Sequence, residues 1–191
     1  MSDQKQLIER YVASFARLDE LSADELLDSV AWELSVGDRD AYGFKSWQPA
    51  KVSTPASCLE KIYRKLPDPF PPLFESLVLS YRWAEVDLRS YRLLANPLGP
   101  DLSGLLEEIS HDVGLWEALL PAGYIAFGKG PDIDYDPVCF DTRSRTREGD
   151  CRIVKIDHEE ILCNYRVKVV GELAPSFEDL MLQTIRLSES S

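Results

Sequence analysis

The sequence predicts an α+β domain in which helices come first, a largely antiparallel sheet follows, and one more helix closes the chain. Three observations support this prediction. Apolar residues recur at helical spacing within the first 65 residues, β-prone runs follow one another after residue 121, and a capped amphipathic segment covers residues 177–187. Consecutive strands favour antiparallel pairing, so we expect a single domain with a mixed, mostly antiparallel sheet packed by helices.

Residues 1–55 are expected to form a helical N-terminal segment that packs on the core. The first helix has one apolar face, formed by Leu7, Ile8, Tyr11, Val12, Phe15 and Leu18. Ser22 and Glu25 have the spacing of a capping box, which predicts that a second helix begins there. That helix would bury Leu26, Leu27, Val30 and Leu34.

Residues 56–191 are expected to form the α+β domain itself. Thr54-Pro55 predicts the cap and first-turn proline of a helix over residues 56–65, and the prolines of residues 67–72 predict another over residues 72–81. Val86 and Leu88 alternate with charged residues, which favours a short strand. Asp101 is the expected N-cap of a helix over residues 102–113.

The second half of the chain supplies most of the expected sheet. β-prone runs cover residues 124–128, 138–141, 152–156 and 165–170. An acidic segment joins the first two runs, so we expect a hairpin there. Ser176 is the expected N-cap of the last helix, and Asp179 lies near the exposed amides of its first turn.

The charge balance narrows the classes of partner. The chain has 21 Lys and Arg against 33 Asp and Glu, a formal net charge of −12 at pH 7. Neutralisation of phosphates by basic residues drives nucleic-acid binding, so this charge argues against a nucleic-acid partner and an anionic membrane. It favours encounter with a basic protein. The sequence also has no apolar stretch near the ~20 residues of a membrane span and no evident secretory signal.

Cysteine usage indicates the cellular compartment. The cysteines are residues 58, 139, 151 and 163, and none forms a Cys-x-x-Cys pair, which excludes a local zinc or thioredoxin-like motif. Cys139 and Cys151 lie in apolar, strand-like contexts, where a thiol behaves as a small hydrophobic group. Four free thiols fit a reducing compartment, so we expect a cytoplasmic protein.

Motifs for common catalytic chemistry are absent from the sequence. It has no Gly-x-x-x-x-Gly-Lys-Ser/Thr, His-Glu-x-x-His or Gly-x-Ser-x-Gly segment, and its histidines are His111 and His158. We therefore expect a protein with no catalytic activity and no cofactor. The alternative is a metal-dependent hydrolase, because carboxylate and imidazole groups bind metal ions. Its ligands would be Asp141, Asp157, His158 and Glu159.

The acidic segment of the expected hairpin resembles part of a calcium-binding loop. Asp132, Asp134 and Asp136 have the spacing of its first three ligands. That loop also needs glycine at position 6 and glutamate at position 12, where this chain has Pro137 and Arg143. An EF-hand is therefore excluded. We interpret the segment as an acidic protein-binding loop, with a looser cation site as the alternative.

Within this loop, Tyr135 lies among the carboxylates and offers a rigid aromatic anchor for a protein partner. A second acidic segment that also contains a tryptophan covers residues 83–87. The predicted partner-binding residues are Trp83, Glu85, Asp87, Asp132, Asp134, Tyr135 and Asp136.

The order of several short motifs resembles the SUKH superfamily. Residues 120–128 read Leu-Pro-Ala-Gly-Tyr-Ile-Ala-Phe-Gly, and an acidic loop and Val138-Cys139-Phe140-Asp141 follow. Residues 153–159 match a strand that ends in an Asp-His-Glu turn, and residues 174–180 match a Ser-Phe-Glu-Asp-Leu helix start. Upstream, Leu66-Pro67 and the segment to residue 81 match a Leu-Pro followed by a short helix. The resemblance covers residues 60–187 and leaves the first 55 residues unmatched; Tyr81-Arg82-Trp83 replaces the family's glycine-rich turn.

This superfamily includes fungal Smi/Knr regulators of cell-wall synthesis and many bacterial toxin-immunity proteins. The resemblance implies a non-catalytic domain that binds a protein, either an immunity protein that neutralises a nuclease-type toxin or a related regulatory scaffold. An acidic domain without a catalytic motif is compatible with docking onto a basic nuclease.

Overall fold

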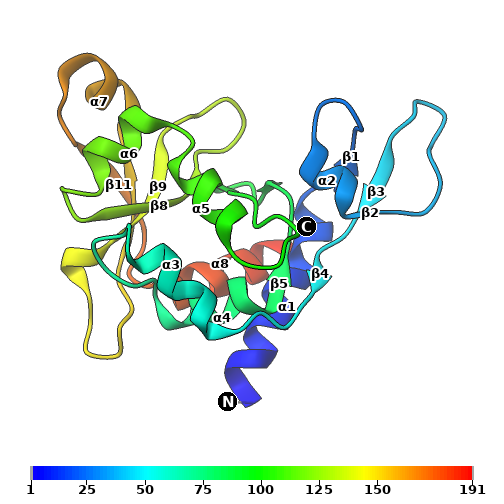
Figure 1. Cartoon of the computed structure of the whole chain (residues 1–191), viewed down its shortest axis with the longest axis horizontal. Helices are drawn as coiled ribbons and strands as arrows, with labels where there is room; N and C mark the ends of the chain where they lie inside the picture. Colours follow the sequence, from blue (N-terminus) through cyan, green and yellow to red (C-terminus); the bar gives the residue numbers. More distant parts are fainter. Residues whose placement is uncertain (1, 191) are drawn as a thin grey trace.

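A computed structural model describes residues 2–190 and confirms the α+β class. The helices are α1 (Ser2–Leu18), α2 (Ser29–Glu33), α3 (Leu59–Tyr63), α4 (Pro72–Ser80), α5 (Ser103–Ser110), α6 (Val113–Leu119), α7 (His158–Asn164) and α8 (Phe177–Glu189), with short 3-10 turns η1 (Ala56–Cys58) and η2 (Thr142–Ser144). The strands are β1 (Ser22–Ala23), β2 (Ser35–Val36), β3 (Lys45–Trp47), β4 (Ala50–Lys51), β5 (Tyr81–Arg82), β6 (Val86–Asp87), β7 (Arg92–Leu93), β8 (Tyr124–Lys129), β9 (Pro137–Asp141), β10 (Ile153–Ile156) and β11 (Val169–Ala174). Figure 1 shows their arrangement.

The main sheet has the strand order β11-β10-β9-β8-β7-β6, and each neighbouring pair is antiparallel. The strands β8 and β9 form the expected hairpin, in which Ile125 is paired with Phe140. Gly128 lets β7 approach β8 closely, because a Cβ at this position would lie 2.6 Å from the carbonyl oxygen of Arg92. The consecutive strands therefore pair as the sequence predicts.

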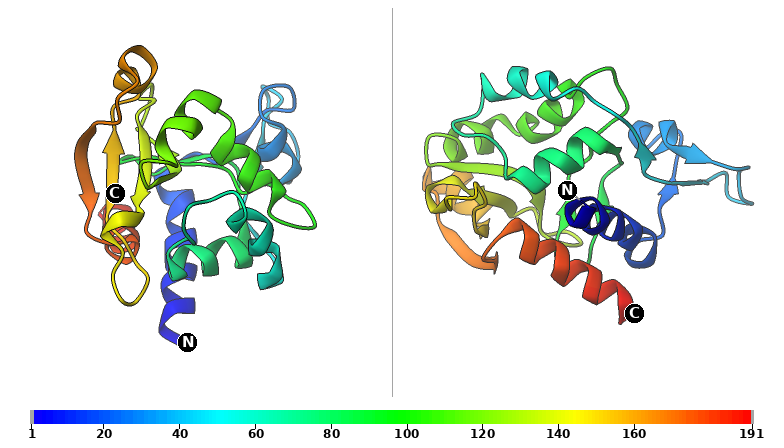
Figure 2. Two further views of the ribbon diagram at one scale, coloured as in Figure 1. Left: turned by 60° about the vertical axis from the view of Figure 1, so that its left-hand side comes forward. Right: turned by 90° about the horizontal axis from the view of Figure 1, so that it is seen from below.

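One face of the sheet is covered by α1, α4 and α8, and α1 lies beside α8 (Figure 2, right). Alternate residues of β8 and β9 point into this core, where Phe127 stacks on Phe140 with ring centroids 4.1 Å apart. Phe74 of α4 and Phe177 of α8 make edge contacts with Phe140 at 5.1 and 5.6 Å. The first helix is thus part of the main core, since Tyr11 has no exposed surface and its hydroxyl lies 2.5 Å from that of Tyr91.

The opposite face of the sheet carries a smaller apolar cluster beneath α6 and α7. Its buried members are Leu119, Tyr124, Cys139, Val154, Ile156 and Ile161. The expected burial of Cys139 and Cys151 is confirmed, whereas Cys163 is exposed and Cys58 is intermediate. Because α6 and α7 are short, they cover this face incompletely, and the candidate site lies beside them.

The segment after α1 differs from the prediction. Residues 22–47 form a small sheet of order β1-β3-β2 with α2, and this arm projects from the body of the molecule (Figure 1). The capping box at Ser22 is not used, because the Asp24 carboxylate accepts the amides of Leu26 and Leu27 at 2.8 and 3.0 Å and forms a turn. Leu26 and Leu27 are 93% and 85% exposed instead of buried. The helix begins later, where Asp28 caps α2.

Two further expectations are corrected in the second half. The single helix expected over residues 102–113 is two helices, because Asp112 leaves the helical conformation and caps α6 through the amide of Leu115 at 3.0 Å. The expected strand over residues 165–170 begins at Val169, because Asp157 caps α7 and Tyr165 ends it with φ at 52°.

The helices of residues 2–190 include none that is both long and apolar enough to cross a membrane.

Candidate functional site

The sheet topology brings most of the predicted partner-binding residues to one end of the main sheet. Asp87 lies on β6, two strands away from the β8–β9 loop that carries Asp132. A hollow of about 370 Å³ joins these two carboxylates with Asp19 and Glu20, which follow α1. Arg89 also lines this hollow. Residues from three distant parts of the sequence therefore form one acidic surface.

Backbone and side-chain hydrogen bonds hold the β8–β9 loop in a defined shape. The amide of Gly130 donates to the carbonyl of Asp136 at 2.9 Å and closes the base of the loop. The amide of Asp134 donates to the carbonyl of Pro131 at 3.0 Å, and the Asp134 carboxylate accepts the amide of Asp136 at 2.9 Å. Between these contacts, Ile133 and Tyr135 are 85% and 59% exposed.

Two of the three predicted loop carboxylates are held by contacts within the protein. Asp134 pairs with Lys155 at 2.8 Å, and Asp136 accepts both the amide and the ring Nδ1 of His158, at 2.9 and 2.7 Å. Burial alone would raise the pKa of Asp134, but the hydrogen bonds and charge of Lys155 and the Asp136 amide lower it overall. The carboxylates of Asp134 and Asp136 thus hold the loop in position. Asp132 is the exposed carboxylate at the tip of the loop.

Trp83 is not on this surface, which corrects the sequence-based prediction. Its side chain is fully buried, and the indole Nε1 donates to the carbonyl of Leu94 at 2.8 Å. The residue pairs with Asn96 in an isolated β-bridge, so its neighbours in the fold cover it. Glu85 is partly buried and forms ion pairs with Lys129 at 2.7 Å and Arg92 at 3.4 Å.

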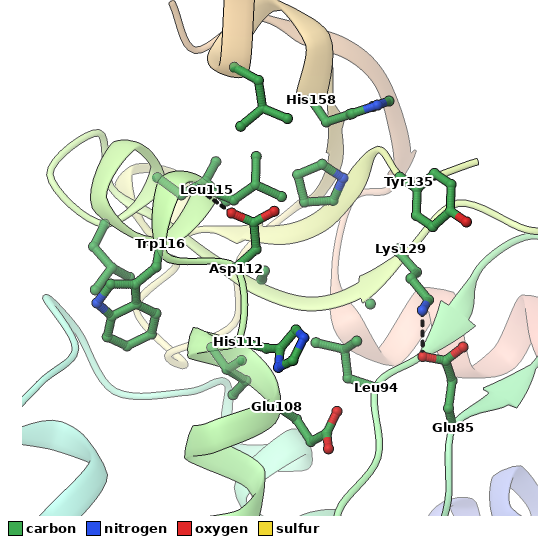
Figure 3. A pocket seen from close by; sticks show the side chains of 17 residues that line it. Glu85, Leu94, Glu108, His111, Asp112, Leu115, Trp116, Lys129, Tyr135 and His158 are labelled. Atoms are coloured by element: carbon green, nitrogen blue, oxygen red, sulfur yellow. Dashed lines mark hydrogen bonds and ion pairs between the residues drawn. The ribbon is translucent and has the colours of Figure 1, made fainter. Parts of the chain in front are cut away.

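A cavity of about 500 Å³ lies beside the loop, between β8 and the helices α5, α6 and α7 (Figure 3). Apolar side chains form much of its wall: Leu94, Ile109, Leu115, Trp116, Leu119, Leu120, Ala126, Pro137 and Leu162. Polar and aromatic groups complete the lining: Glu85, Glu108, His111, Asp112, Lys129, Tyr135 and His158. Its size and its apolar lining with a few polar groups are typical of sites for small molecules.

Most charged groups around the cavity have partners. Lys129 binds Glu85, as Figure 3 shows, and Asp112 accepts the first-turn amide of α6. Glu108 differs, because its carboxylate makes no hydrogen bond or ion pair with any other part of residues 2–190. Burial and the nearby charge of Glu85 raise the pKa of Glu108, and the charges of His111 and Lys129 offset only part of this increase. The cavity thus contains one desolvated carboxyl group without a fixed partner.

The residues of the alternative metal site do not meet. Asp141 is fully buried and binds Arg143 and Arg152 at 2.8 and 2.7 Å. The Asp157 carboxylate caps α7 and pairs with Lys168 at 3.2 Å, while His158 is held by Asp136. Within the described chain, no three His, Cys, Asp or Glu side chains have an arrangement that could hold a metal ion. The structure therefore does not assemble the proposed ligands into one metal site, and the hydrolase hypothesis itself stays a prediction.

Sequence reasoning missed the cavity and Glu108 with it. His111 is exposed, follows the last residue of α5 and lines the cavity. The lining residues come from separate elements with ordinary local patterns, so no short motif marks them. One weak signal is present, because the two histidines of the sequence, His111 and His158, both lie here.

Comparison with known proteins assigns no family to this chain. A scan against protein-family models finds no match, and searches of curated proteins and of solved structures find none either. The SUKH resemblance therefore stays a prediction from sequence motifs. Function has to be argued from the geometry of the site itself.

Proposed function

We propose that this chain is a non-catalytic protein-binding domain that docks onto a basic partner through its β8–β9 loop. The observation that carries this proposal is the display of Ile133 and Tyr135, 85% and 59% exposed, on a loop closed by internal hydrogen bonds. A loop that is already ordered loses little conformational entropy on binding. Exposed tyrosine on such a loop is a common anchor of protein interfaces.

Charge around the loop supports a basic partner. Asp19, Glu20, Asp87 and Asp132 line one hollow, where Arg89 is the accompanying basic residue. The whole chain has a formal net charge of −12. Charges of this kind accelerate association with a basic surface, and the exposed apolar pair then supplies contact area that keeps the complex together.

The sequence resemblance suggests which class of protein-binding domain this is. We propose a SUKH-like domain acting in the cytoplasm, either as an immunity protein against a nuclease-type toxin or as a related regulatory scaffold. The antiparallel α+β fold and the acidic surface are compatible with that role. A nuclease has to present basic groups to its substrate, and an acidic domain can cover them.

Site-specific photo-crosslinking in the cells from which the protein comes tests the docking surface. A photoreactive phenylalanine analogue replaces Tyr135, and the matched control carries it at Tyr42, which is 86% exposed on the projecting arm. We expect one basic protein to be crosslinked through position 135 and not through position 42. Equal crosslinking from both positions, or none from position 135, would contradict the proposal.

The captured partner then allows a quantitative test in purified form. Glu20→Lys combined with Asp132→Asn changes the charge beside the loop by three, and Asp132→Asn suits the positive φ of 53° at that position. Glu60→Lys with Asp38→Asn makes the same change elsewhere on the surface. We expect the first pair to slow association about tenfold at low salt and the second to have little effect. Equal slowing would mean that only the net charge matters.

A further inference from the structure

The cavity beside the β8–β9 loop combines an apolar wall with a surplus of negative charge. Leu94, Ile109, Leu115 and Trp116 contribute to the wall, and the volume of about 500 Å³ is enough for a small organic molecule. Trp116 also lines the cavity, but on the far side of Asp112 and His111 from Glu108 (Figure 3). The body of a suitable ligand is therefore apolar.

The charges specify the polar end of that ligand. Lys129 is paired with Glu85, and Oδ1 of Asp112 accepts the amide of Leu115 at the start of α6. Glu108 faces the cavity without a hydrogen-bond or ion-pair partner among residues 2–190 (Figure 3). A half-buried carboxylate has lost part of its hydration, and an incoming N–H donor would replace it.

We propose that this cavity binds a small organic amine, with its apolar body against the wall and its ammonium group at Glu108. This inference concerns a small ligand and does not depend on the protein-docking function of the loop. A neutral alcohol of the same shape can donate a hydrogen bond to Glu108 but brings no opposite charge, and an anion is repelled by Glu108. We therefore expect the cavity to bind a cation more tightly than a neutral molecule of the same shape.

Isothermal titration calorimetry of the full chain tests this selectivity with three matched probes. They are phenethylamine, which is a cation at neutral pH, phenylethanol, which is its neutral isostere, and hydrocinnamate, which is an anion. Because a hydrogen bond to a charged group is strong, we expect phenethylamine to bind about tenfold or more tightly than phenylethanol, with hydrocinnamate the weakest. Equal affinity for the cation and the alcohol, or no binding of any probe, overturns the proposal.

A pair of neighbouring variants assigns the effect to one carboxylate. Glu108→Gln keeps the shape of the side chain and removes its charge, so it should abolish the preference for phenethylamine. Glu107→Gln makes the same change one residue away, at an exposed position that does not line the cavity, and should leave the preference intact. A preference that survives Glu108→Gln contradicts the assignment. Thermal unfolding of both variants shows whether they are folded.

One more probe separates a free aryl amine from a basic side chain of a partner protein. The capped amino acid N-acetyl-lysine methylamide has the same ammonium group on a flexible chain without an aromatic ring. We expect it to bind at least about tenfold more weakly than phenethylamine, since it cannot pack a ring against the apolar wall. Equal or tighter binding of this probe would show that the cavity recognises a partner's lysine, and would overturn the assignment to a free amine. In Ala126→Leu the larger side chain fills part of the cavity, so every probe should bind more weakly.

Discussion

Replacing Asp141 by asparagine should destabilise the protein through the loss of one buried charge. Asp141 ends β9, and its side chain is fully buried. Arg143 donates from Nε and Nη2 at 2.8 and 3.1 Å, and Arg152 donates from Nε and Nη2 at 3.0 and 2.7 Å. The carboxylate thus joins the end of β9 to the residue that precedes β10. An amide oxygen is a weaker acceptor, and the amide nitrogen opposes a guanidinium donor.

The structure sets the size of this effect. A hydrogen bond to a charged group contributes about 1.5–3 kcal/mol when it is buried. Here the arginine side chains are 54% and 45% exposed, so water screens the pairing and rehydrates both guanidinium groups in the variant. We therefore expect Asp141→Asn to lower the free energy of unfolding by about 2 kcal/mol. For a chain of this length that corresponds to a decrease in Tm of about 4–8 °C.

The pH dependence identifies the charge as the cause. Burial alone would raise the pKa of Asp141, but hydrogen bonds and charges from Arg143 and Arg152 lower it overall. A depressed pKa stabilises the folded state above the unfolded pKa of about 4, and this contribution is lost as pH falls through the folded value. The stability gap between wild type and variant should thus be constant from neutral pH to about pH 5 and shrink below about pH 4.

Urea denaturation followed by circular dichroism at several pH values measures this gap. Asp38→Asn is the matched control, because Asp38 is exposed and its replacement changes the net charge equally. A gap at neutral pH no larger than that of Asp38→Asn would refute the reasoning. So would a gap that stays the same at every pH at which both proteins fold, since the loss would then come from packing rather than charge.

Three further predictions follow from the core, the thiols and the loop. Phe140→Ala removes the centre of the aromatic cluster and should lower the free energy of unfolding by about 3–5 kcal/mol, measured by urea denaturation. In the native protein, Cys163 should react with a thiol reagent quickly and Cys139 only after unfolding, because Cys139 is buried and burial raises the pKa of its thiol; mass spectrometry of timed samples checks this. Gly130→Ala places a Cβ 2.2 Å from Cγ of Asp134, so the loop has to rearrange; amide hydrogen exchange in residues 130–136 should become faster than in wild type.

Regular elements with strong local signals could be predicted from the sequence. The apolar faces of α1 and α4, the β8–β9 hairpin and the Ser176 cap of α8 lie where the sequence indicates. The predictions that failed lie where two local sequence signals of similar strength compete. At Ser22 a capping box competed with the turn formed by Asp24, and the turn is present in the structure. Such competitions differ by small free energies, so the surrounding fold decides them.

Composition and periodicity by themselves determined the fold class, the acidic charge and the exposed position of Tyr135, because these depend on residues close together in the chain. Tertiary structure decided which polar groups have partners. It buried Trp83, neutralised Asp134 with Lys155 across 21 residues, and left Glu108 unpaired in a cavity formed by separate elements. An ion pair or a cavity requires side chains to lie close together in space. Side chains that are far apart in the sequence come close only when the sheet and its helices pack.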